Sequence, residues 1–320
     1  MSNEITDRNI AFVFPGQGSQ SIGMLAEMAA ADAVVEQTFA EASAVLGYDL
    51  WQLIQNGPES ELNQTDKTQP AMLAAGVAMY RVWQNSSAIT PAMMAGHSLG
   101  EYSALVCAGA LPFAAAIDLV EKRGQFMQAA VPSGEGAMAA ILGLDDAQVI
   151  QCCEEAAQGE IIAAVNFNAP GQVVVAGAAA AIERVAVIAK TAGAKRALML
   201  PVSVPSHCDL MRPAAVQMAP LLASVEITAP AIPVIHNADV CAHPNPDAVR
   251  DALLRQLYNP VRWVESVQHL AANGIDTLVE CGPGKVLSGL NKRIDRNMPA
   301  LPIFDPTSLA KAIETVTRED

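Results

Sequence analysis

One five-residue segment of the sequence has the pattern of a serine nucleophile. Residues Gly96 to Gly100 read Gly-His-Ser-Leu-Gly, which matches the G-x-S-x-G turn, where a strained strand-to-helix connection exposes a serine hydroxyl. An apolar run before the segment predicts a strand, and an alanine-rich run after it predicts a helix. Ser98 is therefore the candidate nucleophile. An ordinary glycine-rich turn between a strand and a helix is the alternative interpretation.

A serine hydroxyl needs a base, and histidine is the usual base near neutral pH. His207 lies in the segment Pro-Val-Ser-Val-Pro-Ser-His-Cys, where two prolines fix a loop, and positioned loops often carry catalytic residues. His97 is next to the serine and is expected to point away across the turn. The histidines in ordinary surroundings are His236, His243 and His269. We predict that His207 is the base, with a surface histidine at a helix start as the alternative.

An arginine lies on the apolar face of a predicted helix over residues 113–128. The residues that share the face of Arg123 are Ala116, Leu119, Val120 and Met127. A buried guanidinium requires an anion, and its planar fork suits a carboxylate. That carboxylate would belong either to a substrate or to an internal Asp or Glu, and a snorkelling side chain is a third interpretation.

A second glycine-rich loop follows the first predicted strand, over residues 10–14. The segment from Gly16 to Ser21 lacks the third glycine of G-x-G-x-x-G and has no convincing acidic residue about twenty positions later, so a dinucleotide site is not expected. Backbone N–H groups of such a loop suit a developing oxyanion instead. His236, Cys241 and His243 have a loosely ligand-like spacing without a fourth partner, and we expect no metal site there.

The composition excludes several classes of protein. The chain has 320 residues, of which 52% are hydrophobic and 16% charged, so it is not disordered. With 19 basic and 33 acidic residues the net charge is −14, which argues against nucleic acid and anionic membranes as partners. The apolar stretch 161–182 is interrupted by polar residues, and residues 1–8 lack a signal-peptide pattern, so we expect a cytoplasmic protein. Its six cysteines are expected to be reduced.

The order of predicted elements indicates an α/β fold with an insert. Between residues 138 and 200 the pattern reads strand, helix, strand, strand, helix, strand, which is the ferredoxin-like βαββαβ order. We predict this subdomain over residues 132–203, inserted into a larger α/β domain over residues 1–131 and 204–320. Further strands are predicted at 92–95 and 277–280, and further helices at 34–46, 70–83, 102–107, 248–258, 264–273, 286–296 and 309–317.

The candidate residues belong to a longer ordered series of motifs. They are Phe14-Pro-Gly-Gln-Gly-Ser-Gln20, Gly96-His-Ser-Leu-Gly-Glu-Tyr102, Arg123, Asn166-Phe-Asn168, Pro205-Ser-His207, Gln256-Leu-Tyr-Asn-Pro260 and Gly282-Pro-Gly284. This series, from about residue 10 to residue 296, resembles the malonyl-CoA:acyl carrier protein transacylase family of type II fatty acid synthesis. The resemblance implies a hydrolase-like α/β domain with a ferredoxin-like insert.

The resemblance also implies a role for each site residue. Ser98 would accept the acyl group, His207 would take its proton, and Arg123 would bind the free carboxylate of malonate. The backbone N–H groups of Gln17 and Leu99 would form the oxyanion hole, with Gln17 also contacting the substrate.

The main-chain carbonyl of Gln256 would orient the base where hydrolases use a buried carboxylate, so we predict no acidic triad member. The implied reaction is ping-pong: malonyl-CoA acylates the serine, and the phosphopantetheine thiol of holo acyl carrier protein takes the malonyl group. The family resemblance suggests a monomer without a metal or redox cofactor. Docking of an acidic carrier requires a basic surface, and the candidates are Lys285, Lys292, Arg293 and Arg296, or Lys190, Lys195 and Arg196.

Other activities use similar residues. A trans-acting malonyl acyltransferase of polyketide synthesis would share every catalytic residue. A serine esterase or thioesterase would use the same turn but has no use for Arg123. A patatin-like lipase with a Ser-Asp dyad would be indifferent to loss of His207, and a non-catalytic carrier-protein scaffold would bind carrier without acylating Ser98.

Overall fold

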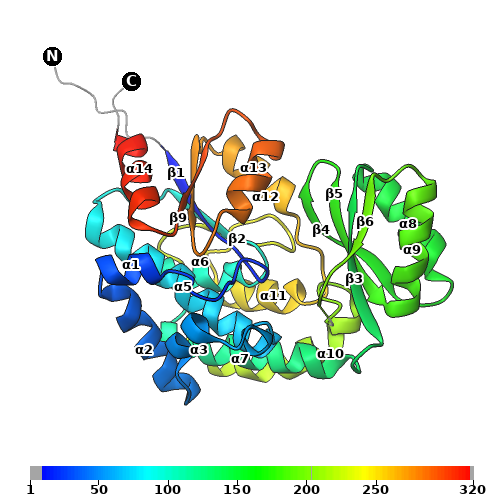
Figure 1. Cartoon of the computed structure of the whole chain (residues 1–320), viewed down its shortest axis with the longest axis horizontal. Coiled ribbons are helices and arrows are strands. Elements are labelled where there is room, and N and C mark those ends of the chain that lie inside the picture. The colour runs from blue at the N-terminus through cyan, green and yellow to red at the C-terminus, as the bar shows by residue number, and fades with distance from the viewer. Residues whose placement is uncertain (1–8, 203, 318–320) are drawn as a thin grey trace.

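The computed structural model describes residues 9–202 and 204–317. They form two β-sheets that lie side by side, each packed against its own helices (Figure 1). The mixed α/β architecture confirms the predicted fold class. The predicted domain limits at residues 1, 203 and 320 lie outside the described residues, as does the polar N-terminal segment 1–8.

The larger sheet is parallel and has five strands. Their order is β7 (Val234–Ile235), β2 (Met93–Gly96), β1 (Ile10–Phe14), β8 (Thr277–Cys281) and β9 (Ala300–Ile303). Successive side chains of a strand point to opposite faces. Accordingly Ile10, Phe12 and Phe14 pack into one hydrophobic cluster and Ala11 and Val13 into another. The unbroken apolar run of β1 thus reflects burial on both faces.

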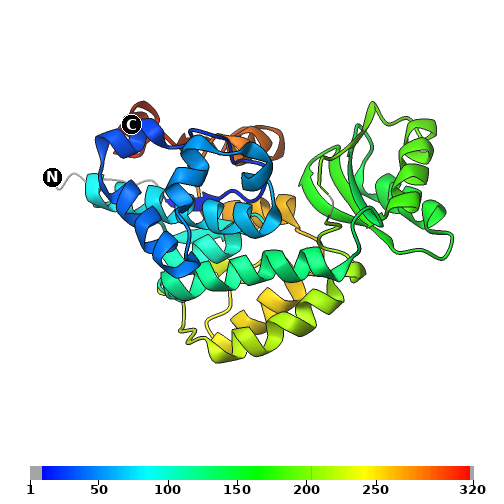
Figure 2. The same cartoon turned by 60° about the horizontal axis from the view of Figure 1, so that its bottom comes forward.

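Helices cover both faces of this sheet. The cluster around Phe12 and Phe14 takes residues from α1 (Ala26–Ala31), α2 (Val34–Leu46), α3 (Leu50–Asn56), α4 (Glu59–Leu62), α5 (Thr65–Ser86), α6 (Gly100–Cys107), α7 (Phe113–Ala130), α10 (Arg212–Ser224), α11 (Pro246–Gln256) and α14 (Pro306–Thr317). The opposite cluster takes residues from α12 (Trp263–Ala272) and α13 (Val286–Ile294). Figure 2 shows α7, in teal, running toward the smaller sheet.

The smaller sheet is antiparallel and has the order β4 (Ile162–Ala169), β5 (Gln172–Ala178), β3 (Gly136–Leu142) and β6 (Arg196–Met199). Two helices pack on one of its faces, α8 (Asp146–Ala157) and α9 (Ala179–Thr191). Asp145 and Gln148 form a capping box that starts α8. All six elements of the predicted βαββαβ unit are therefore present, with boundaries within about two residues.

The other face of the smaller sheet is held against the rest of the molecule. Met138, Val165 and Val174 pack with Cys208, which directly follows His207 in the chain. The edge strand β4 is also bonded to Val261, whose N–H donates to the carbonyl of Val165 at 2.8 Å. These contacts fix the position of the smaller sheet relative to the loop that carries His207.

Some boundaries and elements differ from the sequence-based prediction. Helix α5 begins at Thr65 rather than at Pro70, which lies inside the helix although its ring lacks the N–H of a regular turn. Strand β9 and helix α10 were not predicted, because the prolines at 302, 213 and 220 obscure their patterns. In the described part of the chain, no helix is both long and apolar enough to cross a membrane.

Candidate active site

The segment from Gly96 to Gly100 forms a tight turn between β2 and α6. Ser98 has a φ of 51°, which is an uncommon conformation for a residue with a side chain. A Cβ at Gly96 would lie 1.9 Å from the carbonyl carbon of Gly100, and a Cβ at Gly100 would lie 2.0 Å from the carbonyl oxygen of Phe14. Only glycine fits at both positions, so the turn requires the predicted G-x-S-x-G pattern.

His207 lies beside the serine hydroxyl. Its Nε2 is 2.7 Å from Oγ of Ser98, and its Nδ1 is 2.8 Å from the main-chain oxygen of Gln256. A carbonyl only accepts hydrogen bonds, so Nδ1 carries the proton and Nε2 is left as an acceptor for the hydroxyl. The three residues predicted from distant parts of the sequence are therefore in contact.

The environment of His207 keeps its ring neutral. Burial and, to a smaller extent, the nearby positive charge of Arg123 lower the pKa of His207 from 6.5 to about 3, while the hydrogen bond to Gln256 opposes both. The unprotonated ring is the form that can accept a proton. At neutral pH His207 is thus in the state that a general base needs.

Arg123 is 1% exposed, and its guanidinium lies beside Ser98. Its NH1 donates to Oε1 of Gln69 at 2.7 Å, and its NH2 donates to Oε1 of Gln256 at 3.0 Å and to Oγ of Ser98 at 3.4 Å. Burial lowers the pKa of Arg123, although arginine stays protonated in proteins. A buried side chain is not snorkelling, and the hydrogen bonds of NH1 and NH2 go to neutral amides and the serine hydroxyl, with the Tyr102 ring 5.6 Å from the guanidinium carbon.

These residues surround one cavity of about 120 Å³. Its lining residues are Gln17, Thr65, Gln69, His97, Ser98, Leu99, Arg123, Met127, Met138, Asn166, Leu200, Val202, Val204, Ser206 and His207. Strands β3 and β4 of the smaller sheet contribute Met138 and Asn166, so both sheets build the cavity wall. The lining brings the candidate nucleophile, the candidate base and one cation together with several apolar side chains.

The two predicted oxyanion donors lie at the edge of this cavity. Leu99 directly precedes α6, and the first N–H groups of a helix have no partner within the helix. Gln17 follows β1 in the loop that packs on the serine turn, where a Cβ at Gly16 would lie 2.5 Å from the carbonyl oxygen of His97. The turn and the loop thus support each other at the carboxyl ends of β1 and β2.

The prediction for His97 was wrong, and the sequence did not indicate the contact made by His236. His97 lines the cavity rather than pointing away, and its Nε2 lies 2.8 Å from Oδ1 of Asn168. His236 is completely buried, and its Nδ1 lies 2.7 Å from a carboxylate oxygen of Glu101. Neighbours in the sequence did not reveal these contacts, because their partners lie 71 and 135 residues away.

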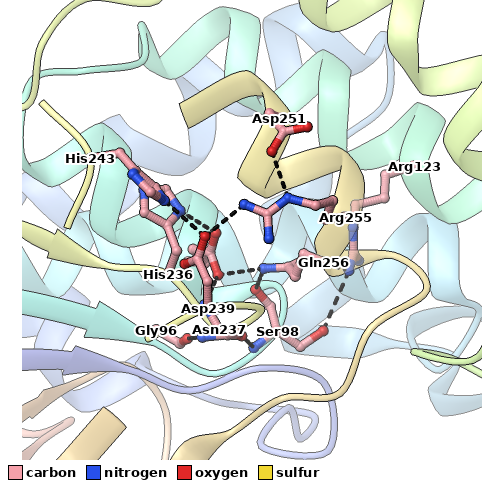
Figure 3. Close-up of polar contacts among 11 residues, drawn as sticks. Gly96, Ser98, Arg123, His236, Asn237, Asp239, His243, Asp251, Arg255 and Gln256 are labelled. Carbon is pink, nitrogen blue, oxygen red and sulfur yellow. Dashed lines mark hydrogen bonds and ion pairs between the residues drawn. The ribbon is translucent and has the colours of Figure 1, made fainter. Parts of the chain in front are cut away.

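Three polar residues near the serine were missed, namely Gln69, Glu101 and Asn237. Asn237 accepts the N–H of Ser98 at 2.7 Å and donates to the carbonyl of Gly96 at 2.7 Å (Figure 3). Glu101 stands three residues after Ser98, a spacing that returns its side chain toward the turn. A buried amide or carboxylate on an apolar helix was the only signal that could have identified Gln69 and Glu101.

The residues considered as metal ligands already have hydrogen-bond partners in the protein. Nε2 of His243 contacts Oδ2 of Asp239 at 2.9 Å, Sγ of Cys241 contacts the main-chain oxygen of Asp239 at 3.4 Å, and His236 contacts Glu101. Within the described residues, no group of three or more His, Cys, Asp or Glu side chains is arranged to hold a metal ion.

The two basic clusters lie in different parts of the molecule. Lys285 and Lys292 line a surface hollow beside β9 and α14, together with Lys311. Arg293, next to them, donates to Oε1 of Gln172 and to the carbonyl of Pro170, and so joins α13 to the smaller sheet. The second cluster, Lys190, Lys195 and Arg196, is exposed on α9, on β6 and between them.

Comparison with known proteins agrees with this geometry. The acyl transferase domain profile matches residues 11–300. The chain belongs to the acyl transferase family. This acyltransferase is 62% identical to the malonyl CoA-acyl carrier protein transacylase of Escherichia coli strain K12 over 304 residues, which cover 95% of this chain and 98% of the relative.

Solved structures give the same result. An acyl carrier protein S-malonyltransferase from Vibrio cholerae O1 biovar eltor matches with a TM-score of 0.93 at 60% identity, covering 95% of this chain and 99% of that one. A structure of a type II PKS acyl-carrier protein in complex with its malonyl-transacylase matches with a TM-score of 0.95 at 57% identity, covering 96% and 99%. The acyltransferase therefore shares its whole fold with these enzymes.

Proposed function

We propose that this acyltransferase moves a malonyl group from malonyl-CoA to the phosphopantetheine thiol of acyl carrier protein, through an ester on Ser98. The observation that carries the proposal is the buried Arg123 guanidinium, 3.4 Å from Oγ of Ser98 and bonded to neutral amides. A cation held at that place favours an acyl group that ends in a carboxylate. The names of the similar transacylases support the same donor and acceptor.

In the first half-reaction, Ser98 attacks the thioester carbonyl of malonyl-CoA. His207 takes the hydroxyl proton on Nε2, across the observed 2.7 Å contact, as the oxygen–carbon bond forms. The carbon–sulfur bond then breaks, and the leaving thiolate of coenzyme A receives that proton from His207. The products are the malonyl-serine ester and free coenzyme A.

The second half-reaction runs in reverse with a different thiol. His207 removes the proton from the phosphopantetheine thiol of the carrier, and the sulfur attacks the ester carbonyl on Ser98. Collapse of the tetrahedral intermediate returns the proton to the serine oxygen and releases malonyl carrier protein. In both steps negative charge builds on the carbonyl oxygen, which the N–H groups of Gln17 and Leu99 would stabilise.

The partners of Arg123 explain how its charge stays available. A carboxylate partner would neutralise the guanidinium and occupy its donor groups. Gln69 and Gln256 instead hold NH1 and NH2 through amide oxygens without adding an opposite charge. The malonate carboxylate would then be the first full negative charge to contact the guanidinium.

Several finer features of the function remain proposals. We expect a cytoplasmic monomer that needs no cofactor, with the serine turn in a domain over 1–131 and 204–320 and the insert over 132–203. For the carrier we favour Lys285 and Lys292, because they frame a hollow with Lys311 and with the apolar side chains of Leu301 and Phe304. An acidic carrier would find complementary charge and apolar surface at that place.

A second candidate function differs from the first only in the pathway that the enzyme serves. Because one similar structure contains a type II PKS acyl-carrier protein, a trans-acting malonyl acyltransferase of polyketide synthesis would use the same residues. A serine esterase is less consistent with the site, since its mechanism gives no role to a buried arginine beside the nucleophile.

Intact-protein mass spectrometry tests the proposal. The wild type is mixed briefly with malonyl-CoA, with Ser98→Ala as the matched control, and holo acyl carrier protein is then added. We expect a malonyl adduct on the wild type only, followed by its transfer to the carrier. Hydrolysis of simple esters without an adduct would identify an esterase, and carrier binding without acylation would identify a scaffold.

A further inference from the structure

Glu101 is a fully buried carboxylate directly behind the nucleophile. It is 0% exposed, and the described structure records no Lys or Arg in ion-pair contact with it. Its three recorded donors are Nδ1 of His236 at 2.7 Å, the N–H of Asn237 at 2.9 Å and Nε2 of Gln256 at 2.8 Å. A buried charge is retained only when such donors compensate for its desolvation. The arrangement of the donors therefore depends on the carboxylate.

The hydrogen bond from Gln256 to Glu101 determines the orientation of the Gln256 amide. Nε2 donates both to Oε2 of Glu101 and to the main-chain oxygen of Ser98 at 2.9 Å. An ionised carboxylate can only accept hydrogen bonds, so the amide nitrogen must face it. The amide oxygen then has to point the other way, toward Arg123.

The orientation of the Gln256 amide matters because the guanidinium of Arg123 lies on its other side. Oε1 of Gln256 accepts from NH2 of Arg123 at 3.0 Å, and Figure 3 shows the Gln256 side chain beside Arg123 and Ser98. A reversed amide would place N–H groups against the guanidinium, donor against donor, and an oxygen against the carboxylate. Through its hydrogen bond to Gln256, Glu101 thus keeps the amide oxygen of Gln256 turned toward Arg123, where that oxygen holds the guanidinium in place.

We propose that Glu101 is a positioning residue that sets the preference for malonyl over acetyl groups, by fixing the Gln256 amide and through it the guanidinium of Arg123. This inference rests on the proposed function. Glu101 has a second branch, in which Asn237 holds the N–H of Ser98. That branch serves every acyl group equally, so the ratio of the two acylation rates isolates the Gln256 branch.

The experiment measures the rate of Ser98 acylation by malonyl-CoA and by acetyl-CoA, each by rapid quench and intact mass. Glu101→Gln keeps the shape but replaces a charged acceptor by a neutral one, which makes weaker hydrogen bonds, and the malonyl-to-acetyl ratio should fall about 10-fold. Glu101→Met removes the acceptor, and displacement of the guanidinium by about 1 Å should lower the ratio on the order of 100-fold.

Glu280 supplies a matched control. It is also fully buried, and its carboxylate accepts from the N–H groups of Leu287 and Ser288 at the start of α13. Glu280→Gln makes the same chemical change and should leave the malonyl-to-acetyl ratio unchanged. It thus reports what loss of a buried charge does to the fold alone.

A double-mutant cycle decides whether the effect passes through the amide. In a Gln256→Leu background, which keeps the main-chain oxygen for His207, Glu101→Gln should change the ratio less than about 2-fold. Additive effects, or a ratio that stays constant in Glu101→Gln, would overturn the inference even if Glu101→Met does not fold. Failure of the wild type to form a malonyl-serine would overturn the proposed function instead.

Discussion

On the side of the larger sheet, the cavity around Ser98 is lined by polar groups with defined hydrogen bonds, whereas on the side of the smaller sheet it is lined mainly by apolar side chains. Arg123, Gln69 and His207 belong to the first side. Met138, Leu200 and Val202 belong to the second, with Asn166 as its polar member. We expect the polar side to determine the chemistry and the apolar side to determine the space that is available to the acyl group.

The difference has a physical reason. A hydrogen-bonded group in a buried site must keep its partner, since an unsatisfied donor or acceptor costs about 1–3 kcal/mol. Apolar contacts are non-directional and tolerate exchange of one side chain for another of similar volume. Substitutions on the polar side should therefore abolish or redirect the reaction, and substitutions on the apolar side should only shift which acyl groups fit.

The largest effect is expected at the nucleophile and its base. His207→Ala removes the histidine in contact with Oγ of Ser98, and general bases contribute about 10²–10⁴-fold. We expect kcat/KM for malonyl transfer to fall at least 10³-fold, and Ser98→Ala to give no acyl adduct at all. Steady-state transfer to holo carrier protein, with circular dichroism to confirm folding, checks this. Full activity of His207→Ala would point to a Ser-Asp dyad.

The next effect concerns Arg123. Arg123→Ala removes the cation of the polar side but leaves Ser98 and His207 in contact, so acylation by acetyl-CoA should continue. We expect kcat/KM for malonyl-CoA to fall about 10²-fold or more, because a charge-assisted pair with the carboxylate is lost. Competition between the two donors measures the switch, and Lys122→Ala on the exposed face of the same helix is the control. An unchanged malonyl preference would contradict the role of Arg123.

The sequence predicted the polar side in part. Ser98, His207 and Arg123 could be identified from the sequence because each lies in an unusual local pattern. These patterns are a strained glycine turn, a proline-fixed loop and a charge on an apolar helix face. Gln69 and Glu101 also place a polar group on an apolar helix, but their contacts and those of Asn237 join segments that are distant along the chain. A hydrophobic pattern indicates that a residue is buried, but it does not indicate which polar group will face it.

The fold shows the same difference between features that local sequence patterns predict and features that depend on distant contacts. The βαββαβ unit was predicted almost completely, because its strands and helices are regular and local in sequence. The parallel sheet was predicted less well, since β7 has only two residues and β9 contains Pro302. Short edge strands are defined by their neighbours in space, and the sequence does not carry that information locally.

The pH dependence gives an effect of intermediate size. Because burial and the charge of Arg123 lower the pKa of His207 to about 3, the base stays unprotonated below pH 6.5. The acid limb of kcat/KM should therefore lie well below pH 6.5 in the wild type. Arg123→Ala removes one of these causes, so the limb for acetyl transfer should move toward 6.5. A limb near 6.5 in both proteins would contradict the described environment of His207.

The same shift affects stability in a defined direction. The unfolded chain binds a proton on His207 as pH falls through 6.5, whereas the native state does not bind it until about pH 3. The native state should therefore lose stability as pH falls across this window. Urea unfolding at several pH values measures the loss, and His207→Gln, which cannot titrate, should show a smaller one.

The smallest effect is expected on the apolar side. Met138 is 6% exposed on β3 and lines the cavity, so Met138→Ala enlarges the space without removing a hydrogen bond. We expect the malonyl reaction to change less than 10-fold, and the preference for malonyl over methylmalonyl to fall about 10-fold, because one methyl group in an apolar pocket is worth about 1–3 kcal/mol. Competition between the two thioesters measures this.

Met127→Ala provides the comparison for that result, since Met127 lines the same cavity from α7 and contacts Gln69 through its sulfur at 3.6 Å. It touches the amide that holds Arg123, so its loss should lower malonyl acylation itself rather than the discrimination between malonyl and methylmalonyl. If Met138→Ala lowered malonyl acylation as strongly as Met127→Ala, the apolar side would take part in positioning the carboxylate. If neither substitution changed acyl selectivity, the space around Ser98 would be set by the backbone of the two sheets rather than by these side chains.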